Sequence, residues 1–395
     1  MEPIITVIAF VLFLIYAGLI LYYRRSWLAI VDFGLPILDL KPVTRISVII
    51  PARNEAQNIG NCLESLLRQS YPKELFEVLV VDDHSTDDTA AIVTSFNLSN
   101  IKLLALKDLV PANEINSYKK KAIEIAIARS TGELIVTTDA DCVVPHNWLQ
   151  TIAAFYEEKK PSLIVMPVAI NSNNKFIEIF QALDFMTLQG ITGASVNKKF
   201  HSMCNGANLA YTKKAFTAAD GFAGIDTIAS GDDMLLMYKI FKQDPAAVLF
   251  LRSKEVIVQT QPVNSIKDFF SQRIRWASKA DQYDDKRIFA VLLIVYLFNL
   301  LLLALPVISL FNNKAFSIHV YPVTIVGTII NWWLFLLVTK TIIELIFLYP
   351  VAKFFNKKGL LWVFPLMQPF HILYTVIAGW LGKFGSYKWK GRNVK

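Results

Sequence analysis

Apolar residues are unevenly distributed along the chain, with long apolar runs at both ends and a mixed pattern between them. Residues 4–23 and 288–311 are apolar runs, and a third and a fourth lie within residues 318–351 and 360–381. A helix rises about 1.5 Å per residue, so about 20 apolar residues cross a hydrocarbon core of about 30 Å. The ends therefore predict membrane helices, and residues 45–286 predict a separate globular domain.

The middle of the chain alternates β-branched runs with segments of helical spacing. The predicted strands are residues 46–50, 76–81 and 133–136, and the predicted helices are 56–69, 86–96 and 119–129. Strands that alternate with helices predict a doubly wound, mostly parallel α/β sheet. Such sheets bind ligands beyond the carboxyl ends of their strands. Polar segments follow all three predicted strands, at residues 51–55, 82–85 and 139–141.

Two acids, Asp139 and Asp141, follow the third predicted strand. Side chains alternate along an extended chain, so residues two apart project to the same side. Two such carboxylates repel each other unless a cation lies between them, and hard oxygen ligands suit Mg²⁺ or Mn²⁺. The pair therefore predicts a site for a divalent ion and a diphosphate. A solvated turn is the alternative.

Basic residues flank the apolar runs. Arg24 and Arg25 follow the first run, which favours a cytoplasmic location for the middle domain and an uncleaved anchor rather than a signal peptide. The basic tail, residues 383–395, also favours the cytoplasm, with Asn313 and Lys314 in a short outer turn. Three crossings after a cytoplasmic domain would leave the tail outside. One of the last two apolar segments is therefore expected to be re-entrant or interfacial.

Composition narrows the partners. The 395 residues are 54% hydrophobic and 18% charged, with a net charge of +8 concentrated near the apolar runs. This charge favours anionic lipid over nucleic acid, and no nucleic-acid partner is expected. The three cysteines are scattered, which indicates a reducing compartment rather than a disulfide framework or a zinc site.

Six motifs in the middle domain resemble those of the family 2 glycosyltransferases. On the donor side these are residues 48–55 (VIIPARNE), 80–87 (VVDDHSTD) and 139–141 (DAD). On the acceptor side they are residues 205–211 (NGANLAY), 231–233 (GDD) and 272–276 (QRIRW, matching Gln-x-x-Arg-Trp). The tail motif, residues 389–392 (WKGR), is similar to that of membrane-embedded members that glycosylate lipid-type acceptors. The resemblance extends to the cellulose synthase, hyaluronan synthase and ceramide glucosyltransferase superfamily, and implies a GT-A fold.

The resemblance implies a set of residues that bind the nucleotide sugar, namely Pro51, Arg53, Glu55, Asp83, Lys120 and Asp139. Asp83 would accept a hydrogen bond from uracil, with a helix N-cap as the alternative. Residues 119–121 are lysines at a helix start, which the helix dipole disfavours, so one of them is expected to reach the diphosphate or the base. A solvated face is the alternative for each lysine. Asp141 would bind the metal directly, and Asp139 would contact the ribose or a metal-bound water.

The implied catalytic residues are Asp233, Asp232, Gln272, Arg275 and Trp276. Asp233 would be the general base of an inverting transfer, with Asp232 raising its pKa. The alternative for these acids is an N-cap of the helix that follows them. Asn205, Gly206 and Asn208, together with Trp276, would bind the acceptor.

The Gln-x-x-Arg-Trp residues have helical spacing. Gln272, Arg275 and Trp276 lie at i, i+3 and i+4, on one face of a helix. Arg275 would offer a cationic fork to the diphosphate, and Trp276 a flat surface to an acceptor sugar or lipid. A juxtamembrane amphipathic helix with interfacial Arg and Trp is the alternative.

Together these features predict a membrane-anchored, metal-dependent inverting glycosyltransferase of the cell envelope. It would move a sugar from a nucleotide-sugar donor, expected to be UDP-linked, to a lipid or glycan acceptor at the cytoplasmic face. A processive polysaccharide synthase and a non-catalytic membrane scaffold are the alternatives. The expected segments are an anchor (1–25), a linker (26–44), the transferase domain (45–286), membrane segments (287–382) and a basic tail (383–395).

Overall fold

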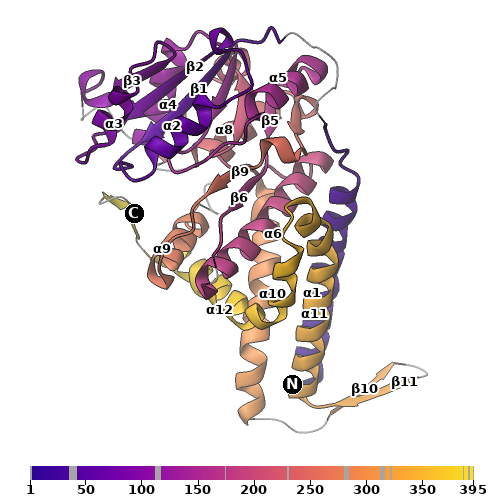
Figure 1. Cartoon of the computed structure of the whole chain (residues 1–395). Coiled ribbons are helices and arrows are strands. Elements are labelled where there is room, and N and C mark those ends of the chain that lie inside the picture. Colours follow the sequence, from indigo (N-terminus) through magenta and orange to yellow (C-terminus); the bar gives the residue numbers. More distant parts are fainter. Residues whose placement is uncertain are drawn as a thin grey trace. The chain divides into compact units, whose positions relative to one another are not determined.

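The chain divides into two compact units in the computed structural model (Figure 1). The structure describes residues 2–34, 42–111, 117–173, 175–228, 231–279, 284–311, 316–320, 323–385, 387–389 and 392–394. Unit 1 consists of Met1–Ala29, Lys175–Gly190 and Val263–Lys395, and unit 2 of Ile30–Asn174 and Ile191–Pro262. Unit 2 thus overlaps the predicted transferase domain but leaves two of its segments to unit 1. Parts of the predicted linker and tail lie outside the described residues.

Unit 2 is built on a seven-stranded sheet with the order β3-β2-β1-β4-β7-β5-β8. The strands β1 (Ile46–Ala52), β2 (Phe76–Asp82), β3 (Ile101–Ala105) and β4 (Leu134–Thr137) run parallel. The strand β7 (Leu209–Thr212) runs antiparallel to β4 and to β5 (Leu163–Val165), and β8 (Val248–Phe250) runs parallel to β5. A two-stranded sheet pairs β6 (Val168–Ile170) with β9 (Val258–Thr260). The predicted mostly parallel α/β sheet is confirmed.

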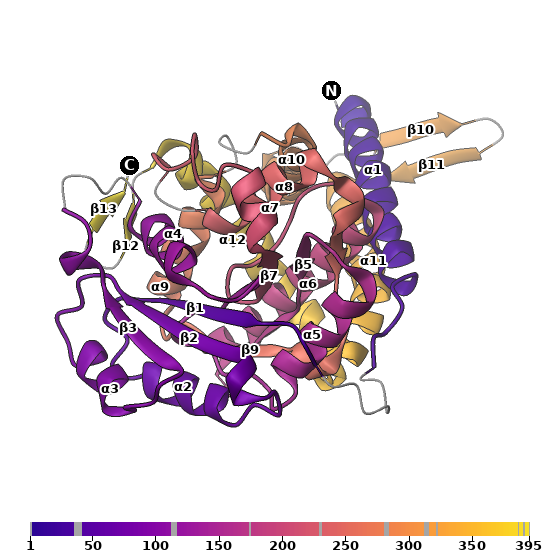
Figure 2. The same ribbon diagram turned by 90° about the horizontal axis from the view of Figure 1, so that it is seen from above.

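Helices cover both faces of this sheet. The helices α2 (Ile59–Leu67) and α3 (Thr89–Ser95) lie on one face, and α4 (Tyr118–Arg129) and α8 (Asp232–Gln243) on the other (Figure 2). Every residue of β2 is buried, as expected for a central parallel strand covered on both faces. The other elements of unit 2 are α5 (Trp148–Lys159), α7 (Lys213–Ala218), η1 (Lys73–Leu75), η2 (Leu106–Asp108), η4 (Pro245–Ala247) and η5 (Lys254–Val256). The register pairs Ala52 with Asp82, so the polar segments that follow β1 and β2 are neighbours.

Unit 1 contains the long apolar helices. Three helices of its described part are long and apolar enough to cross a membrane: α1 (Glu2–Leu28), α10 (Lys286–Phe311) and α11 (Ile329–Phe354). The remaining elements are α9 (Ile266–Ala277), η7 (Lys358–Trp362), α12 (Phe364–Phe384), the hairpin β10 (Phe316–Val320) and β11 (Val323–Gly327), and the pair β12 (Tyr387–Trp389) and β13 (Arg392–Val394). The long helix α6 (Phe176–Lys198) contributes its first part to unit 1 and its remainder to unit 2.

The third and fourth apolar runs have different structures. The run predicted within residues 318–351 begins in the hairpin, and the helix starts only at Ile329. The fourth run forms α12, with Pro365 in its first turn and Pro369 inside, and α12 is not among the three candidate spans. The predicted outer turn at Asn313 and Lys314 lies outside the described residues.

A buried polar cluster joins three helices of unit 1. Lys340 Nζ lies 2.7 Å from Glu344 Oε1 and donates to Gln368 Oε1 at 2.7 Å. Gln368 Nε2 donates to Glu344 Oε2 at 2.6 Å, and the Tyr16 hydroxyl donates to Glu344. The cluster therefore connects α1, α11 and α12. Ionised side chains inside apolar helices are costly unless they are paired, and here each has a partner.

Candidate functional site

Acids from separate segments meet around one lysine at the carboxyl edge of the unit 2 sheet. Lys119, in the first turn of α4, places Nζ 2.9 Å from Asp139 Oδ1, just beyond β4. The same nitrogen lies 3.5 Å from Asp232 Oδ2, at the start of α8. Burial alone would lower the pKa of this ammonium, but Asp139, Asp232 and Asp233 raise it above its usual range. Lys119 therefore stays protonated and positively charged among the acids.

Asp233 is held by the backbone on both sides. Its Oδ2 accepts from the Gly206 amide at 2.9 Å, and its Oδ1 accepts from the Met234 amide at 2.8 Å. The N-cap of α8 is Gly231, whose φ of +77° a residue with a side chain rarely adopts. Asp232 and Asp233 thus occupy the first turn of α8 rather than its cap, where the helix dipole favours negative charge.

Asp141 lies one residue beyond a buried Ala140 and has partners on both carboxylate oxygens. Thr260 Oγ1, at the end of β9, donates to Asp141 Oδ2 at 3.3 Å, and Cys142 Sγ lies 3.6 Å from Oδ1. Burial raises the pKa of the Cys142 thiol well above its usual range, so the thiol stays protonated. Within the described ranges no group of three or more His, Cys, Asp or Glu side chains could hold a metal ion. A divalent ion here would need further oxygen ligands from water or a diphosphate.

The predicted acceptor loop lies against these acids. Thr137 Oγ1, the last residue of β4, donates to the Gly206 carbonyl at 2.9 Å, and Asn205 Oδ1 accepts from the Ala207 amide at 2.9 Å. A Cβ added at Gly206 would stand 3.4 Å from Asp232 Oδ2 and 3.6 Å from Lys119 Nζ. Gly206 is therefore the point where the loop passes closest to the lysine and the acids.

Asn208 differs from its predicted role. Its side chain is fully buried, and Nδ2 donates to the carbonyls of Pro167 and Val256 at 2.7 Å each. Its Oδ1 accepts from Trp148 Nε1 at 3.0 Å. These bonds tie the loop to the interior of unit 2 and leave the amide inaccessible to an acceptor. The prediction of an acceptor contact is corrected to a structural role.

The polar segments after β1 and β2 form the second part of the site. Arg53 Nη1 donates to the Asp83 carbonyl at 2.8 Å and lies 3.7 Å from Asp83 Oδ1. His84 Nδ1 lies 3.1 Å from the same Oδ1, and the His84 ring meets the edge of Tyr118 with 5.7 Å between centroids. The N-cap of α3 is Asp88, so the alternative role of Asp83 as a cap does not apply.

Further hydrogen bonds fix these two segments to each other. Asp87 accepts from the Ala56 amide at 3.0 Å, and Glu55 donates its amide to Thr89 Oγ1 at 2.8 Å. Burial alone would raise the pKa of Asp87, but hydrogen bonds from Thr89 and Ala56 lower it. The Glu55 carboxylate accepts from Asn58 at 2.9 Å, and Pro51 lies within β1.

The three consecutive lysines have different environments. Lys120 is 2% exposed, and its Nζ donates to the carbonyls of Ile225 and Ile228 at 2.6 and 2.5 Å. Lys121 lies at the surface, 3.0 Å from Glu124 Oε2. Lys119 is the one whose ammonium lies among the acids, whereas the Lys120 ammonium is engaged by backbone carbonyls. A contact of Lys120 with the nucleotide sugar stays a prediction.

The Gln-x-x-Arg-Trp residues lie on α9, which belongs to unit 1. Gln272, Arg275 and Trp276 are each partly exposed, whereas Arg273 between them is 4% exposed. The Arg273 guanidinium stacks over the Trp276 ring at 4.1 Å and donates Nη1 to Gln272 Oε1 at 2.8 Å. The motif spacing had pointed to Arg275, and the sequence held no signal for Arg273 beyond a second basic residue.

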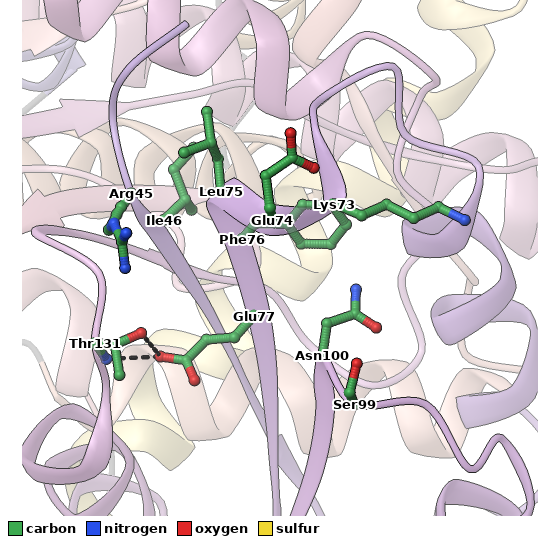
Figure 3. A pocket seen from close by; sticks show the side chains of 10 residues that line it. All are labelled: Arg45, Ile46, Lys73, Glu74, Leu75, Phe76, Glu77, Ser99, Asn100 and Thr131. Carbon is green, nitrogen blue, oxygen red and sulfur yellow. Dashed lines mark hydrogen bonds between the residues drawn. The ribbon is translucent and has the colours of Figure 1, made fainter.

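A hollow in unit 2 lies away from the acids. It is lined by Arg45, Ile46, Lys73, Glu74, Leu75, Phe76, Glu77, Ser99, Asn100 and Thr131 (Figure 3). These residues stand at the start of β1 and β2, at the opposite end of the strands from the acids. Inside it, Glu77 Oε1 accepts from the Thr131 amide and hydroxyl at 2.6 and 2.8 Å. The hollow does not belong to the candidate site.

Comparison with known proteins identifies the family. Residues 47–217 match the family described as Glycosyl transferase family 2, and residues 134–374 match Glycosyl transferase family group 2. The second match covers more than half of the chain. The chain therefore belongs to the family 2 glycosyltransferases.

Individual relatives match parts of the chain. Glycosyltransferase AglE of Haloferax volcanii is 37% identical over 105 residues, which are 27% of this chain and 33% of that protein. The probable glycosyltransferase YdaM of Bacillus subtilis is 26% identical over 255 residues, which are 62% of this chain and 57% of that protein. The chain thus spans about a third and somewhat more than half of these relatives. The mannosyltransferase PcManGT of Pyrobaculum calidifontis, solved with GDP-Man and Mn²⁺, is 20% identical with a TM-score of 0.55, covering 93% of this chain and 99% of that one. This likeness confirms the fold.

Proposed function

We propose that the chain is a membrane-anchored, metal-dependent inverting glycosyltransferase. It moves one sugar from a nucleotide-sugar donor to a lipid or lipid-linked acceptor. The carrying observation is the convergence of Asp139, Asp232 and Asp233 around the single ammonium of Lys119. Family membership supports sugar transfer as the reaction. Asp233 is the base, since its carboxylate is fixed by the Gly206 and Met234 amides at the helix start.

On the donor side, Asp83 accepts a hydrogen bond from the base, expected to be uracil. Arg53 and Glu55 order its loop, and Pro51 lies next to the last residue of β1. Arg53 donates to the main-chain carbonyl of Asp83. The same guanidinium orients the Asp83 carboxylate through the 3.7 Å ion pair. A GDP-linked donor, as in the complex of PcManGT, is the alternative. Lys119 turns from Asp139 toward the diphosphate when the donor binds.

Asp141 would hold a divalent ion at the donor site directly, and Asp139 would contact the ribose or a water on that ion. Two carboxylates at one strand end suit such an ion. A lysine alone would bind the diphosphate weakly, because an ammonium 4 Å from a phosphate contributes only about 1 kcal/mol in water and about 4 kcal/mol at an effective dielectric of about 20. When bound, Mg²⁺ or Mn²⁺ stabilises the charge of the departing diphosphate. Thr260 holds the Asp141 carboxylate in place through the 3.3 Å hydrogen bond.

In the transfer step the acceptor oxygen forms a bond to the anomeric carbon as the bond from that carbon to the diphosphate breaks on the opposite face. The acceptor proton goes to Asp233, and the nucleoside diphosphate leaves with the electron pair. Asp232, only 8% exposed, keeps the negative charge near the base. Asn205 and Gly206 border the acceptor. The family resemblance assigns Gln272, Arg275 and Trp276 on α9 to catalysis and to acceptor binding.

The long apolar helices of unit 1 support the proposed acceptor and membrane topology. Three candidate spans in the described part make a poor channel for a growing polymer, which favours a single transfer over a processive synthase. Arg24 and Arg25 favour a cytoplasmic unit 2. All three native cysteines are buried. An Ala91→Cys variant, exposed on α3, should therefore resist a membrane-impermeant maleimide in intact cells and react after lysis.

The test compares Asp233→Asn with Asp88→Asn, an exposed acid at the N-cap of α3. Purified protein is incubated with labelled UDP- and GDP-sugars, a lipid extract and Mn²⁺. Asp233→Asn should lose at least about 100-fold in transfer rate, while Asp88→Asn keeps the wild-type rate. Product with one added sugar supports the single transfer, and long polymer supports the synthase. Wild-type rates in Asp233→Asn would overturn the assigned base, and no turnover of any donor by the wild type would favour the scaffold.

A separate binding measurement tests the metal. Ligands that bind the native state raise its melting temperature. Nucleoside diphosphate with Mn²⁺ should stabilise the wild type more than the nucleotide alone, and Asp141→Asn should lose this increment. An equal increment in the Asp141→Asn variant would exclude Asp141 as the metal ligand.

A further inference from the structure

Unit 1 contains a buried carboxylate that the proposed function does not use. Asp184, on the first part of α6, is 7% exposed. Its Oδ2 accepts from Arg273 Nη2 at 2.6 Å and from Arg273 Nε at 3.1 Å. Its Oδ1 accepts from the Tyr374 hydroxyl of α12 at 2.5 Å and lies 4.0 Å from His371 Nε2. Both oxygens are therefore engaged, and α6, α9 and α12 meet at one carboxylate.

Arg273 uses the rest of its guanidinium on the Gln-x-x-Arg-Trp motif. Its Nη1 donates to Gln272 Oε1 at 2.8 Å, which makes the amide oxygen of Gln272 face inward and leaves its NH₂ group as the outer donor. The guanidinium plane also stacks on Trp276 at 4.1 Å and on Phe269 at 4.7 Å. One face of the Trp276 ring is thus covered, and the ring plane is fixed.

We propose that Asp184 is a positioning residue, which acts through Arg273 to set the orientation of Gln272 and Trp276 for the acceptor. This inference rests on the proposed function, because that function gives Gln272 and Trp276 their role. Only a planar guanidinium can donate in its plane to Asp184 and to Gln272 while its face stacks on an aromatic ring. A lysine at position 273 would keep the charge and lose this geometry.

The alternative is an ion pair that merely joins three helices. A buried pair of this kind is costly to assemble, and apolar residues often join helices as well, so stability alone is a weak reason for it. The two roles predict different kinetics. A positioning residue acts through Gln272 and Trp276 and therefore changes acceptor use, whereas a purely structural residue lowers stability and every activity together.

The first experiment uses the full-length protein in lipid nanodiscs, with the variants Asp184→Asn and Arg273→Lys. The double variant Asp184→Asn/Arg273→Gln leaves no buried charge unpaired, so it keeps the test possible if the single variants fail to fold. Each should raise the acceptor KM by about 10-fold or more. Stabilisation by UDP or GDP with Mn²⁺ should stay within about twofold of wild type in apparent affinity. Tyr374→Phe, which removes one hydrogen bond but keeps the ion pair, should show a smaller effect in the same direction. An unchanged acceptor KM overturns the proposal.

The second experiment measures dependence on the target residues. In a Gln272→Ala/Trp276→Ala background, Asp184→Asn should cost no more than about twofold in kcat/KM, because both residues that it positions are already absent. The same fold loss in both backgrounds overturns the proposal.

Hydrogen exchange separates this inference from the proposed function. The amides of residues 266–277 should exchange faster in Asp184→Asn, with those of α5 as the unchanged control. If the wild type transfers no sugar, the proposed function fails, and the exchange of α9 still decides whether Asp184 orders this helix. Unchanged exchange of α9 overturns the inference.

Discussion

Lys119 Nζ donates to Asp139 Oδ1 across 2.9 Å, which joins the first turn of α4 to the residues just beyond β4. An ammonium at a helix start opposes the helix dipole, so its position needs a local reason. The reason is the surrounding acids, which include Asp232 at 3.5 Å. Lys119 thus balances part of the negative charge of these acids. When a diphosphate arrives, the same ammonium has a new anion within its reach.

We therefore expect Lys119→Met to lower the transfer rate by about 100-fold. Removing a group that stabilises negative charge developing in a transition state has effects of this size. The matched control is Lys121→Met on the same helix, which removes a surface lysine that pairs with Glu124. The raised pKa of Lys119 keeps it charged, so its stabilising effect is complete below the unfolded pKa of about 10.4 and is lost only at higher pH. Transfer rates of the wild type and both variants at pH 7 test the first statement, and unfolding of the wild type and Lys119→Met below and above pH 10 tests the second. Equal rates for Lys119→Met and wild type would contradict the assignment.

Two glycines offer a contrast between catalytic space and folding. A Cβ at Gly206 would meet Asp232, Asp233 and Lys119 at 3.4–3.6 Å, which is ordinary contact. Gly206→Ala should thus leave the free energy of unfolding within about 0.5 kcal/mol of wild type. It should still lower transfer by about 10-fold or more, because its methyl group occupies space beside the reacting groups.

Gly132→Ala is the opposite case. Its Cβ would stand 2.5 Å from the Ser47 backbone nitrogen and 2.7 Å from the Ile46 carbonyl carbon, so the backbone of β1 must shift. We expect it to cost about 3 kcal/mol or more in unfolding free energy. Thermal unfolding and transfer rates of both variants distinguish the two effects. Parallel losses of stability and activity in Gly206→Ala would remove its proposed place beside the reaction.

The sequence predicted the sheet and the edge at which the acids lie, because buried parallel strands are continuous apolar runs that end at polar residues. Asp83 and Asp139 follow such strands, and Asp233 lies in the first turn of a helix. Their positions followed from local pattern alone. Consecutive lysines are different. Adjacent helix positions point about 100° apart, so the choice between Lys119 and Lys120 depends on how α4 is rotated against its neighbours.

Other features depend on contacts between distant segments. The predicted helix at residues 56–69 begins only at Ile59, because Ala56 and its neighbours bond instead to the segment after β2. Asn208 matches the family pattern, yet its amide partners lie on three other segments. Likewise, the motif spacing selects Arg275, whereas only tertiary packing reveals that Asp184 is the partner of Arg273.

Glu77, in the hollow of Figure 3, should make stability depend on acid. Burial alone would raise its pKa, but hydrogen bonds from Lys102, Thr131 and Ser47 lower it from 4.5 to about 2. A lowered folded pKa means that the stabilisation is present above about pH 4.5 and is lost as the pH falls toward 2. We expect a loss of about 2 kcal/mol over this window, allowing for solvent around Lys102.

The measurement is thermal unfolding at pH 6 and pH 3 for wild type, Glu77→Gln and the control Glu74→Gln, an exposed neighbour in the same hollow. Glu77→Gln should be less stable than wild type at pH 6, and the difference should shrink at pH 3. Glu74→Gln should follow the wild type at both pH values. A stability difference independent of pH would show that Glu77 acts through packing rather than charge.

The cluster around Lys340 predicts a non-additive result within unit 1. Lys340→Met alone leaves Glu344 buried with one fewer counter-charge, and Glu344→Leu alone leaves the ammonium of Lys340 with Gln368 as its remaining polar partner. Breaking a buried pair from one side costs about 3–5 kcal/mol, whereas replacing both partners by apolar groups is often neutral. The double variant Lys340→Met/Glu344→Leu should therefore be more stable than either single variant. Thermal unfolding in nanodiscs measures this cycle, with Lys353→Met at the end of α11 as the control. Additive losses would mean that Lys340 and Glu344 act separately, each satisfied by water or lipid rather than by the other.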